Sequence, residues 1–179
     1  MPKETKTAIK KAFLSLLQTS SFDNITVRDI AEKCKINRNT FYYNFEDIYA
    51  LTEEILQEET EKIVNAHKTH KTWNEGLLDA AQFAKANKKA ILNLHKSSKS
   101  CYLVKYFKKV IYNVAIEFVN AEAKNLNVCR SDLDFYTCAL MGLLSEWLDD
   151  GMKSDFMPVI EKTGLLFDNG IKRALEILA

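Results

Sequence analysis

The segment at residues 26–45, TVRDIAEKCKINRNTFYYNF, constrains the fold of this chain more than any other stretch. Thr26 can cap the start of a helix, and Asp29, three residues later, completes a capping box. The arrangement begins again at Asn37, whose side chain can cap a second helix. The segment therefore predicts two short helices joined by a tight turn.

The polar and apolar residues of this segment divide cleanly between two faces. The apolar set occupies staple positions or faces inward and consists of Ile25, Ile30, Ala31, Ile36, Phe41 and Phe45. The outward positions of the second helix hold Arg38, Asn39, Thr40, Tyr42, Tyr43 and Asn44. Exposed tyrosines beside Arg, Asn and Thr are unusual on a merely solvated surface. This pattern predicts a helix-turn-helix with its recognition helix at residues 37–44, with an ordinary helical hairpin as the alternative.

Composition favours an all-α protein, because five glycines and two prolines in 179 residues leave few residues that favour turns. The formal net charge is +1, and residues 1–50 hold eight Lys and Arg against six Asp and Glu. Such a mild balance cannot by itself hold nucleic acid. Any affinity for double-stranded DNA must therefore come from individually placed contacts and from dimerisation.

The four cysteines are Cys34, Cys101, Cys129 and Cys138, and no CxxC pair occurs. The N-terminal residues lack the apolar stretch of a signal peptide, and no apolar run approaches the roughly 20 residues that span a bilayer. We expect a cytoplasmic protein with reduced, mostly structural cysteines and no membrane partner.

Helical apolar stripes continue along the chain at residues 5–19, 48–68, 73–86, 88–96, 101–124, 131–150 and 155–178. The first of these helices should pack across the two helices of the motif. We therefore predict a three-helix DNA-binding domain at residues 1–46. A helical bundle for ligand binding and dimerisation follows at residues 47–179.

The last two predicted helices carry wide apolar faces. These faces either fill the core of one subunit or pair with their copies across a two-fold axis. We favour the homodimer, because a helix-turn-helix usually reads paired half-sites. The predicted dimerisation residues are Leu140, Leu143, Leu144, Trp147, Leu166 and Ile171.

The N-terminal third resembles the TetR-type (TetR/AcrR) transcriptional regulators. Their motif is close to T-V-x-D-I-A-x-x-A-G-V-S-x-x-T-L-Y-Y-H-F, which the chain matches at residues 26–31 and 40–45. The runs NRNTFYY at 37–43 and FEDIY at 45–49, with GLLSEWLDDG at 142–151, are similar to one subgroup. That subgroup includes the regulator of a dihydroxyacetone kinase operon.

The resemblance implies a homodimer that places one recognition helix per subunit in successive major grooves. It assigns DNA contacts to Arg28, Arg38, Asn39, Thr40, Tyr42, Tyr43 and Asn44. Arg38 and Asn39 occupy base-reading positions, where Arg suits guanine and Asn suits adenine. Three departures from the family pattern are Lys35 in place of Gly at the turn, Ile48 in place of a phosphate-binding Lys, and Cys34 in place of Ala.

Family members often bind a small-molecule effector in the C-terminal bundle. Candidate pocket aromatics, with core filling as the alternative, are Phe83, Tyr102, Tyr106, Phe107, Tyr112, Phe118 and Tyr136. The segment Lys85–Lys109 holds eight lysines and no acidic residue, which suits either an anionic ligand or a solvated face. His67 and His70 have a spacing that can share a metal, but no third ligand is fixed nearby, so we predict no metal site.

Nothing in the sequence resembles a phosphate-binding glycine loop, a nucleophile elbow or a paired-carboxylate site. We therefore predict no enzymatic activity and no cofactor. The predicted function is a sequence-specific DNA-binding repressor that recognises a palindromic operator as a homodimer and that a small-molecule effector can release. The alternative is a co-activator of the same fold that works through a protein partner.

Overall fold

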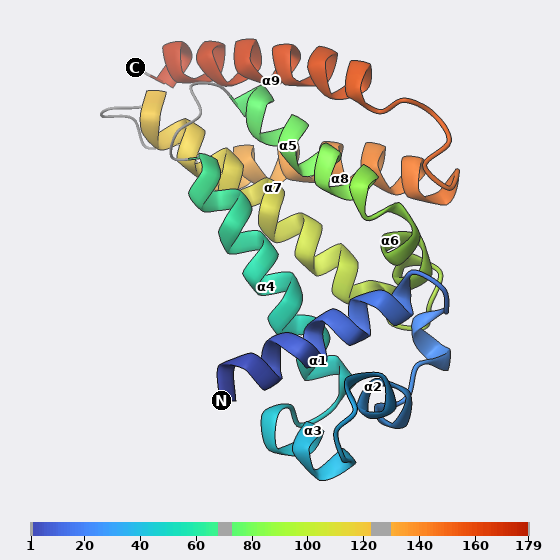
Figure 1. Cartoon of the computed structure of the whole chain (residues 1–179). Coiled ribbons are helices and arrows are strands. Elements are labelled where there is room, and N and C mark those ends of the chain that lie inside the picture. Colours follow the sequence, from blue (N-terminus) through green and yellow to red (C-terminus); the bar gives the residue numbers. More distant parts are fainter. Residues whose placement is uncertain (1, 68–72, 123–129, 179) are drawn as a thin grey trace. The chain divides into compact units, whose positions relative to one another are not determined.

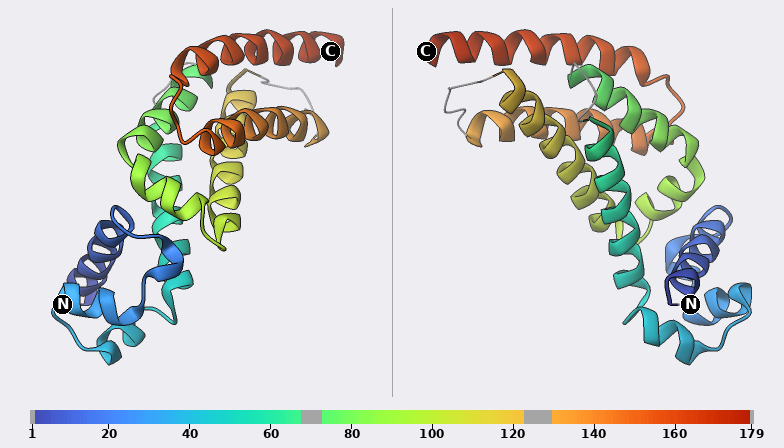
Figure 2. Two further views of the ribbon diagram at one scale, coloured as in Figure 1. Left: turned by 90° about the vertical axis from the view of Figure 1, so that its right-hand side faces the viewer. Right: turned by 60° about the vertical axis from the view of Figure 1, so that its left-hand side comes forward.

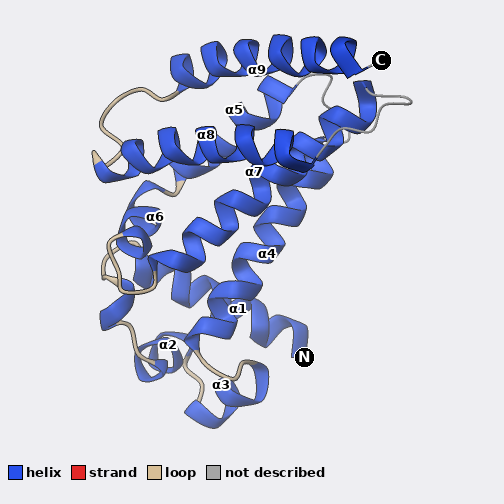
Figure 3. Ribbon diagram, turned by 180° about the vertical axis from the view of Figure 1, so that it is seen from behind, coloured by secondary structure: helices blue, strands red, loops and turns tan. Residues whose placement is uncertain are grey.

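The computed structural model describes residues 2–67, 73–122 and 130–178, and every regular element in these ranges is helical (Figures 1 and 3). The α-helices are α1 (Pro2–Leu17), α2 (Val27–Cys34), α3 (Arg38–Asn44), α4 (Ile48–His67), α5 (Trp73–Ala86), α6 (Lys88–His95), α7 (Ser100–Glu122), α8 (Arg130–Asp149) and α9 (Met157–Leu178). A short 3₁₀ turn, η1 (Phe22–Asn24), lies between α1 and α2. The all-α prediction is confirmed, and the predicted helix ranges agree with these bounds to within three residues.

The chain forms two compact units. The first unit comprises the chain up to Glu59 together with Asn87–Lys105, and the second comprises Thr60–Ala86 together with the chain from Tyr106 onward. Helices α4 and α7 each contribute to both units. The functional division predicted after residue 46 remains a prediction, since compactness and function need not divide a chain at the same residue.

In the first unit, α1 packs against α2, α3 and α6 (Figure 1). The core is apolar and almost fully enclosed; it includes Ile9, Phe13, Leu17, Phe22, Ile30, Phe41, Phe45 and Leu51. The rings of Phe13 and Phe22 meet edge to face at 6.1 Å, which fixes η1 against α1. The helix-turn-helix is therefore packed against an enclosed apolar core.

In the second unit, α5 packs along α9, as Figures 1 and 2 show from different sides. Its buried side chains include Leu77, Val110, Val114, Leu140, Trp147 and Ile160, which lie on α5, α7, α8 and the start of α9. Thr137 is a buried polar residue on α8, and its hydroxyl donates to the Leu133 carbonyl oxygen at 2.7 Å. The Thr137 hydroxyl thus has its hydrogen-bond partner within its own helix.

Among the described residues, no helix combines the length and the hydropathy needed to cross a membrane.

Candidate nucleic-acid interface

Helix α2 begins with the predicted capping box. The Asp29 backbone N–H donates to the Thr26 hydroxyl oxygen at 3.2 Å, and the Thr26 backbone N–H donates to the Asp29 carboxylate at 2.8 Å. Hydrogen bonds from the Thr26 hydroxyl and backbone hold the pKa of Asp29 below its ordinary value of 3.8. The start of α2 is therefore fixed by residues only three positions apart.

The turn between the two helices passes through Lys35, which adopts the left-handed conformation with φ 56° and ψ 41°. The Ile36 backbone N–H donates to the Ala31 carbonyl at 3.0 Å, and this bond closes the end of α2. A side chain in this conformation costs about 1–2 kcal/mol, because its Cβ crowds the following carbonyl. The Gly that the family favours at this position would avoid that cost.

Helix α3 begins at the second predicted cap. The side-chain carbonyl oxygen of Asn37 accepts hydrogen bonds from the Thr40 backbone N–H at 2.8 Å and from the Thr40 hydroxyl at 3.1 Å. On the inner side of α3, Phe41 is fully buried, and the Phe45 ring lies 5.9 Å from it. One face of this seven-residue helix is thus held in the core while the other faces out.

The outward face of α3 presents four of the seven predicted DNA contacts. Arg38 and Asn39 are exposed at its first turn, and the exposed fractions of Tyr42 and Tyr43 are 55 % and 86 %. Together they offer a guanidinium, an amide and two phenols, which can hydrogen-bond to base edges and phosphate oxygens. The Tyr42 ring meets Phe41 edge to face at 5.6 Å, so its direction is set by a buried neighbour.

The other three predicted contacts already have partners within the chain. Arg28 pairs with Glu32 at 2.7 Å, the Asn44 amide donates to the Thr40 carbonyl at 2.7 Å, and Thr40 is used in the Asn37 cap. The Arg28–Glu32 pair is exposed, and such pairs contribute little energy, so phosphate can replace Glu32. The side chains of Arg28, Thr40 and Asn44 thus each have a hydrogen-bond partner within the chain, in α2 or at α3.

Two lysines of α1 face acidic residues of α4, a pairing that the sequence analysis missed. Lys6 contacts Glu54 at 2.8 Å, and Lys10 contacts Glu54 at 2.7 Å and Glu58 at 2.6 Å. Burial works against the charge of Glu54, but the hydrogen bonds and charges of Lys10 and Lys6 outweigh it and lower its pKa from 4.5. These lysines therefore attach α1 to α4.

The turn between α6 and α7 is joined to η1 in the same unit. The Ser98 backbone N–H and hydroxyl donate to the Asp23 carboxylate at 2.9 and 2.7 Å, and they hold its pKa below 3.8. The Asn93 amide donates to the Leu17 carbonyl at 2.7 Å, at the end of α1. No local sequence pattern predicts these hydrogen bonds, because 75 or 76 residues separate their partners.

The residues of the lysine-rich segment Lys85–Lys109 divide between the two units. The Lys99 ammonium lies 5.0 Å from the centre of the Tyr49 ring in the first unit. Lys85 pairs with Asp155 at 3.7 Å in the second. Of the histidine pair considered for a metal, His70 lies outside the described residues and so does the side chain of His67.

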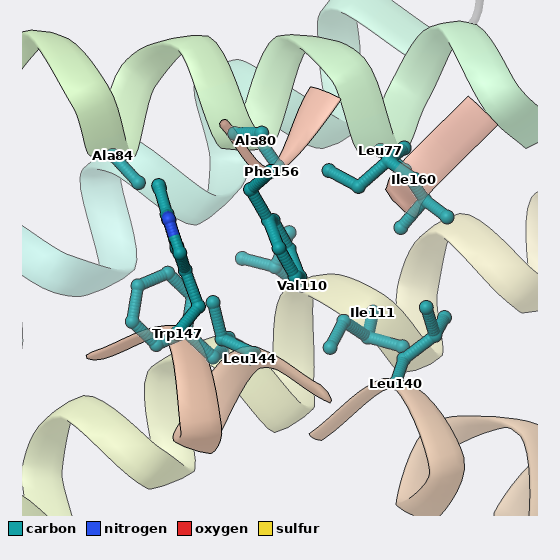
Figure 4. A pocket seen from close by; sticks show the side chains of 12 residues that line it. Leu77, Ala80, Ala84, Val110, Ile111, Leu140, Leu144, Trp147, Phe156 and Ile160 are labelled. Atoms are coloured by element: carbon teal, nitrogen blue, oxygen red, sulfur yellow. The ribbon is translucent and has the colours of Figure 1, made fainter. Parts of the chain in front are cut away.

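Of the aromatic residues predicted to line a ligand pocket, Phe107 lines a hollow in the second unit, whereas the residues that line it do not include Phe83, Tyr102, Tyr106, Tyr112 and Tyr136. Tyr102 lies in the first unit, stacked on Tyr49 at 6.0 Å, whereas Tyr106 is buried against Phe107 in the second. Tyr136 approaches Gly170, Phe83 and Tyr112 are half-buried, and the Phe118 side chain lies outside the described residues. The hollow (Figure 4) is lined by Leu77, Ala80, Ala81, Ala84, Phe107, Val110, Ile111, Leu140, Leu144, Trp147, Phe156 and Ile160.

The predicted dimerisation residues fall into three groups. Leu140, Leu144 and Trp147 are buried within one chain, where they line the hollow, so the core of a single chain accounts for their apolar character. Leu143 is half-buried and Leu166 is 64 % exposed, while the Ile171 side chain lies outside the described residues. Phe135 and Leu165 are also exposed, at 67 % and 61 %, and the sequence analysis did not single them out as contacts.

Comparison with known proteins agrees with this geometry. A family described as bacterial regulatory proteins of the tetR family matches residues 9–55, which contain the helix-turn-helix. A second family, described as a transcriptional regulator C-terminal region, matches residues 71–169, more than half of the chain. These matches define a helix-turn-helix transcriptional regulator.

Individual relatives are more distant. An uncharacterized HTH-type transcriptional regulator from Bacillus subtilis, YxbF, is 32 % identical over 66 residues, which cover 37 % of this chain and 17 % of the relative. DhaS from Lactococcus lactis, the transcriptional activator of the dhaKLM operon, is 27 % identical over 115 residues, which cover 61 % of this chain and 62 % of the relative. The chain thus matches less than two thirds of the length of either curated relative.

Solved structures share the fold at low identity. The dihydroxyacetone kinase operon activator DhaS gives a TM-score of 0.73 at 19 % identity, with 97 % of each chain covered. A TetR transcriptional regulator from Streptococcus agalactiae gives 0.70 at 21 % identity, covering 93 % of this chain and 94 % of that one. The chain belongs to the TetR family of DNA-binding transcriptional regulators, with a likeness to DhaS, and this family comprises regulators rather than enzymes.

Proposed function

We propose that this protein acts as a homodimer that reads a two-fold symmetric operator with one α3 helix per subunit. The observation that supports this most directly is the exposed face of α3, where Arg38, Asn39, Tyr42 and Tyr43 stand on a helix fixed by Asn37 and Phe41. Such a dimer would place its recognition helices about 34–36 Å apart, one turn of B-DNA.

Selection of binding sites from a random DNA library tests this proposal. A palindromic site should be enriched by the native protein, and its affinity should fall steeply with salt as phosphate counterions are released. Arg38→Ala should lower affinity for that site by about 1–3 kcal/mol, as loss of a bidentate base contact does. Arg173→Ala, which removes the same charge from the exposed surface of α9, is the matched control and should leave affinity unchanged.

Failure of enrichment even at low salt would overturn autonomous DNA reading. It would favour the alternative in which the protein acts through a partner protein. Equal losses for Arg38→Ala and Arg173→Ala would show that binding depends on total charge rather than on α3.

We further propose that the exposed apolar residues of α8 and α9 form the dimer contact. Phe135, Leu165 and Leu166 are each more than 60 % exposed, and burial of such side chains stabilises association by roughly 1.5–3 kcal/mol each. On α8, the exposed Cys138 and Gly142 follow Phe135 at helical spacing, and their small side chains would allow close approach of a second helix.

The molecular mass in solution tests this contact. Leu166→Glu should convert the dimer to a monomer, because a carboxylate would be buried without a partner. Gln82→Glu introduces the same carboxylate on the exposed surface of α5 and should leave the dimer intact. A dimer that persists in Leu166→Glu and in Phe135→Glu would place the interface elsewhere.

The direction of regulation is a separate point. The sequence analysis favoured repression, whereas the Lactococcus relative is described as an activator. We therefore propose operator-dependent regulation without assigning repression. Transcription in vitro from a template that carries the selected site distinguishes the two, since a repressor lowers transcript yield and an activator raises it.

A further inference from the structure

The turn between α6 and α7 carries three serines whose surroundings differ. The Ser97 side chain is buried, and its hydroxyl donates to the Leu94 carbonyl at 2.6 Å. Ser100 is half-buried and begins α7. Ser98 is exposed and lies outside both helices. Because an enzyme that modifies a hydroxyl must first reach it, Ser98 is the serine of this turn that such an enzyme can use.

The sequence around Ser98 is strongly basic. Lys96 lies two residues before it, Lys99 directly follows it, and the segment Lys85–Lys109 contains eight lysines and no acidic residue. Lys96 is exposed, and the Lys99 ammonium lies in the same unit, 5.0 Å from the centre of the Tyr49 ring. Phosphoserine carries close to two negative charges at neutral pH, so flanking ammonium groups stabilise it. The same lysines complement an enzyme whose peptide-binding groove is acidic.

The Ser98 hydroxyl joins two segments of the first unit. Ser98 donates to the Asp23 carboxylate through its backbone N–H at 2.9 Å and through its hydroxyl at 2.7 Å. The backbone bond, the hydroxyl bond and the charge of Lys99 hold the pKa of Asp23 below 3.8, so this carboxylate is ionised at neutral pH. Asp23 belongs to η1, and Thr26, which caps α2, follows η1 after one residue. The hydroxyl therefore ties the α6–α7 turn to the segment that leads into the helix-turn-helix.

A phosphoryl group on Ser98 would reverse this contact. In the transfer, the hydroxyl oxygen forms a bond to the γ-phosphorus of a nucleoside triphosphate, the bond from that phosphorus to the β–γ bridging oxygen breaks, and a nucleoside diphosphate leaves. The hydroxyl proton passes to a base of the enzyme and then to water. The O–H donor is thereby lost, and a phosphate with close to two negative charges replaces it beside the Asp23 carboxylate. Two anions at hydrogen-bonding distance repel, so the pair must separate.

We propose that Ser98 is a phosphorylation site for a serine kinase that selects basic substrates, and that phosphate at this position releases η1 from the α6–α7 turn. The phosphate then pairs with the flanking Lys96 or Lys99 instead. Release of η1 loosens the start of α2, which carries Arg28, and weakens binding to DNA. The effect on DNA rests on the proposed function, whereas the modification and the release of η1 do not.

Phosphate transfer to the folded protein tests the site. The native protein is incubated with ATP and the catalytic domain of protein kinase C, a kinase that selects serines flanked by basic residues. Mass spectrometry of proteolytic fragments should find phosphate on Ser98 and not on Ser97 or Ser100, which share the same lysines but are less exposed. Phosphate on either of these two in place of Ser98, or on none of the three, would overturn the assignment.

Hydrogen exchange of η1 tests the release without DNA. For this measurement phosphoserine is incorporated at position 98 during translation, so that every chain carries the phosphate. The backbone amides of Asn24 and Ile25 donate to carbonyls of the same turn and should exchange at least tenfold faster than in the native protein. Ser98→Ala, which loses the hydroxyl but gains no charge, should accelerate exchange less than threefold. An unchanged rate in the phosphorylated protein would contradict the release, and so would equal acceleration in Ser98→Ala.

Removal of the opposing charge tests the cause. Asp23→Asn replaces the carboxylate with an amide that can donate to phosphate, so phosphoserine at position 98 should then accelerate η1 exchange less than threefold. Phosphoserine at position 100 adds the same charge two residues further along, at the start of α7, and is the matched control. Equal effects of the phosphate with and without the Asp23 carboxylate would overturn the proposed repulsion.

Operator binding separates this inference from the proposed function. Phosphoserine at position 98 should weaken operator binding at least tenfold, whereas Asp23→Asn, or phosphoserine at position 100 instead, should limit the loss to less than threefold. A protein that binds its operator equally well with and without the phosphate on Ser98 would retain the proposed function and lose the switch. Accelerated η1 exchange in a protein that binds no operator in either form would overturn the proposed function and retain the release.

Discussion

The helix-turn-helix of the first unit and the hollow of the second are built in different ways. The helix-turn-helix is fixed by bonds that span three residues, from Thr26 to Asp29 and from Asn37 to Thr40. The hollow is lined by residues from position 77 to position 160. The helix-turn-helix is therefore specified by neighbouring residues, whereas the shape of the hollow depends on how several helices and one connection pack together.

The largest expected effect concerns the base of the helix-turn-helix. Phe41→Ala should destabilise the protein by about 3–5 kcal/mol, because it removes a fully buried ring and leaves a cavity. Chemical denaturation followed by circular dichroism measures this loss. Asn39→Ala, on the exposed side of the same helix, should stay within about 0.5 kcal/mol of the native protein. Similar losses for both variants would mean that α3 is not anchored through Phe41.

Two left-handed residues, one in each region, offer a sharper contrast. Met152→Gly relieves the backbone but removes a buried side chain, whose loss costs about 2–5 kcal/mol. The net effect should be a destabilisation of about 1–4 kcal/mol in denaturant unfolding. A more stable Met152→Gly variant would show that the Met152 side chain contributes little packing.

The same change in the turn of the helix-turn-helix should have the opposite sign. Lys35 is exposed, so Lys35→Gly relieves the left-handed strain and loses little packing. We expect a gain of about 1 kcal/mol in the free energy of unfolding. Lys33→Gly, inside α2, is the control and should cost about 1 kcal/mol. A destabilised Lys35→Gly variant would contradict this account of the turn.

The smallest expected effect is a dependence on pH. The pKa of Glu54 is lower in the folded protein than its ordinary value of 4.5, so its pairing stabilises the fold above that value. This contribution is lost as the pH falls through the lowered folded pKa. Because the pair is partly exposed, the loss should stay below about 1 kcal/mol. Unfolding free energies measured across the acid range should vary less in Glu54→Gln, and an unchanged slope would exclude this pair as a source.

The sequence predicted those features that depend on neighbouring residues. The caps at Thr26 and Asn37 and the helix ranges all follow from patterns a few residues long. The pairing of Lys6 and Lys10 with Glu54 and Glu58 could not be predicted in this way, because the sequence does not state which helix faces α1. The lining of the hollow could not be predicted from the sequence either, since aromatic residues at helical spacing do not reveal which of them meet in space.

The α8 stripe shows the same limit. An apolar face as wide as that of Leu140, Leu143, Leu144 and Trp147 can be buried within a chain or between chains. The structure places three of the four inside the chain. Packing in three dimensions, rather than composition, decides which apolar side chains remain for a partner.

The bonds from Asn93 to Leu17 and from Ser98 to Asp23 also bear on how this protein can be recombined with others. A chimera that joins residues 1–46 to the bundle of another regulator would lack both donors. A transplant that retains operator affinity should therefore carry the 87–105 segment with it. The portable unit of DNA recognition in this protein is discontinuous in the gene.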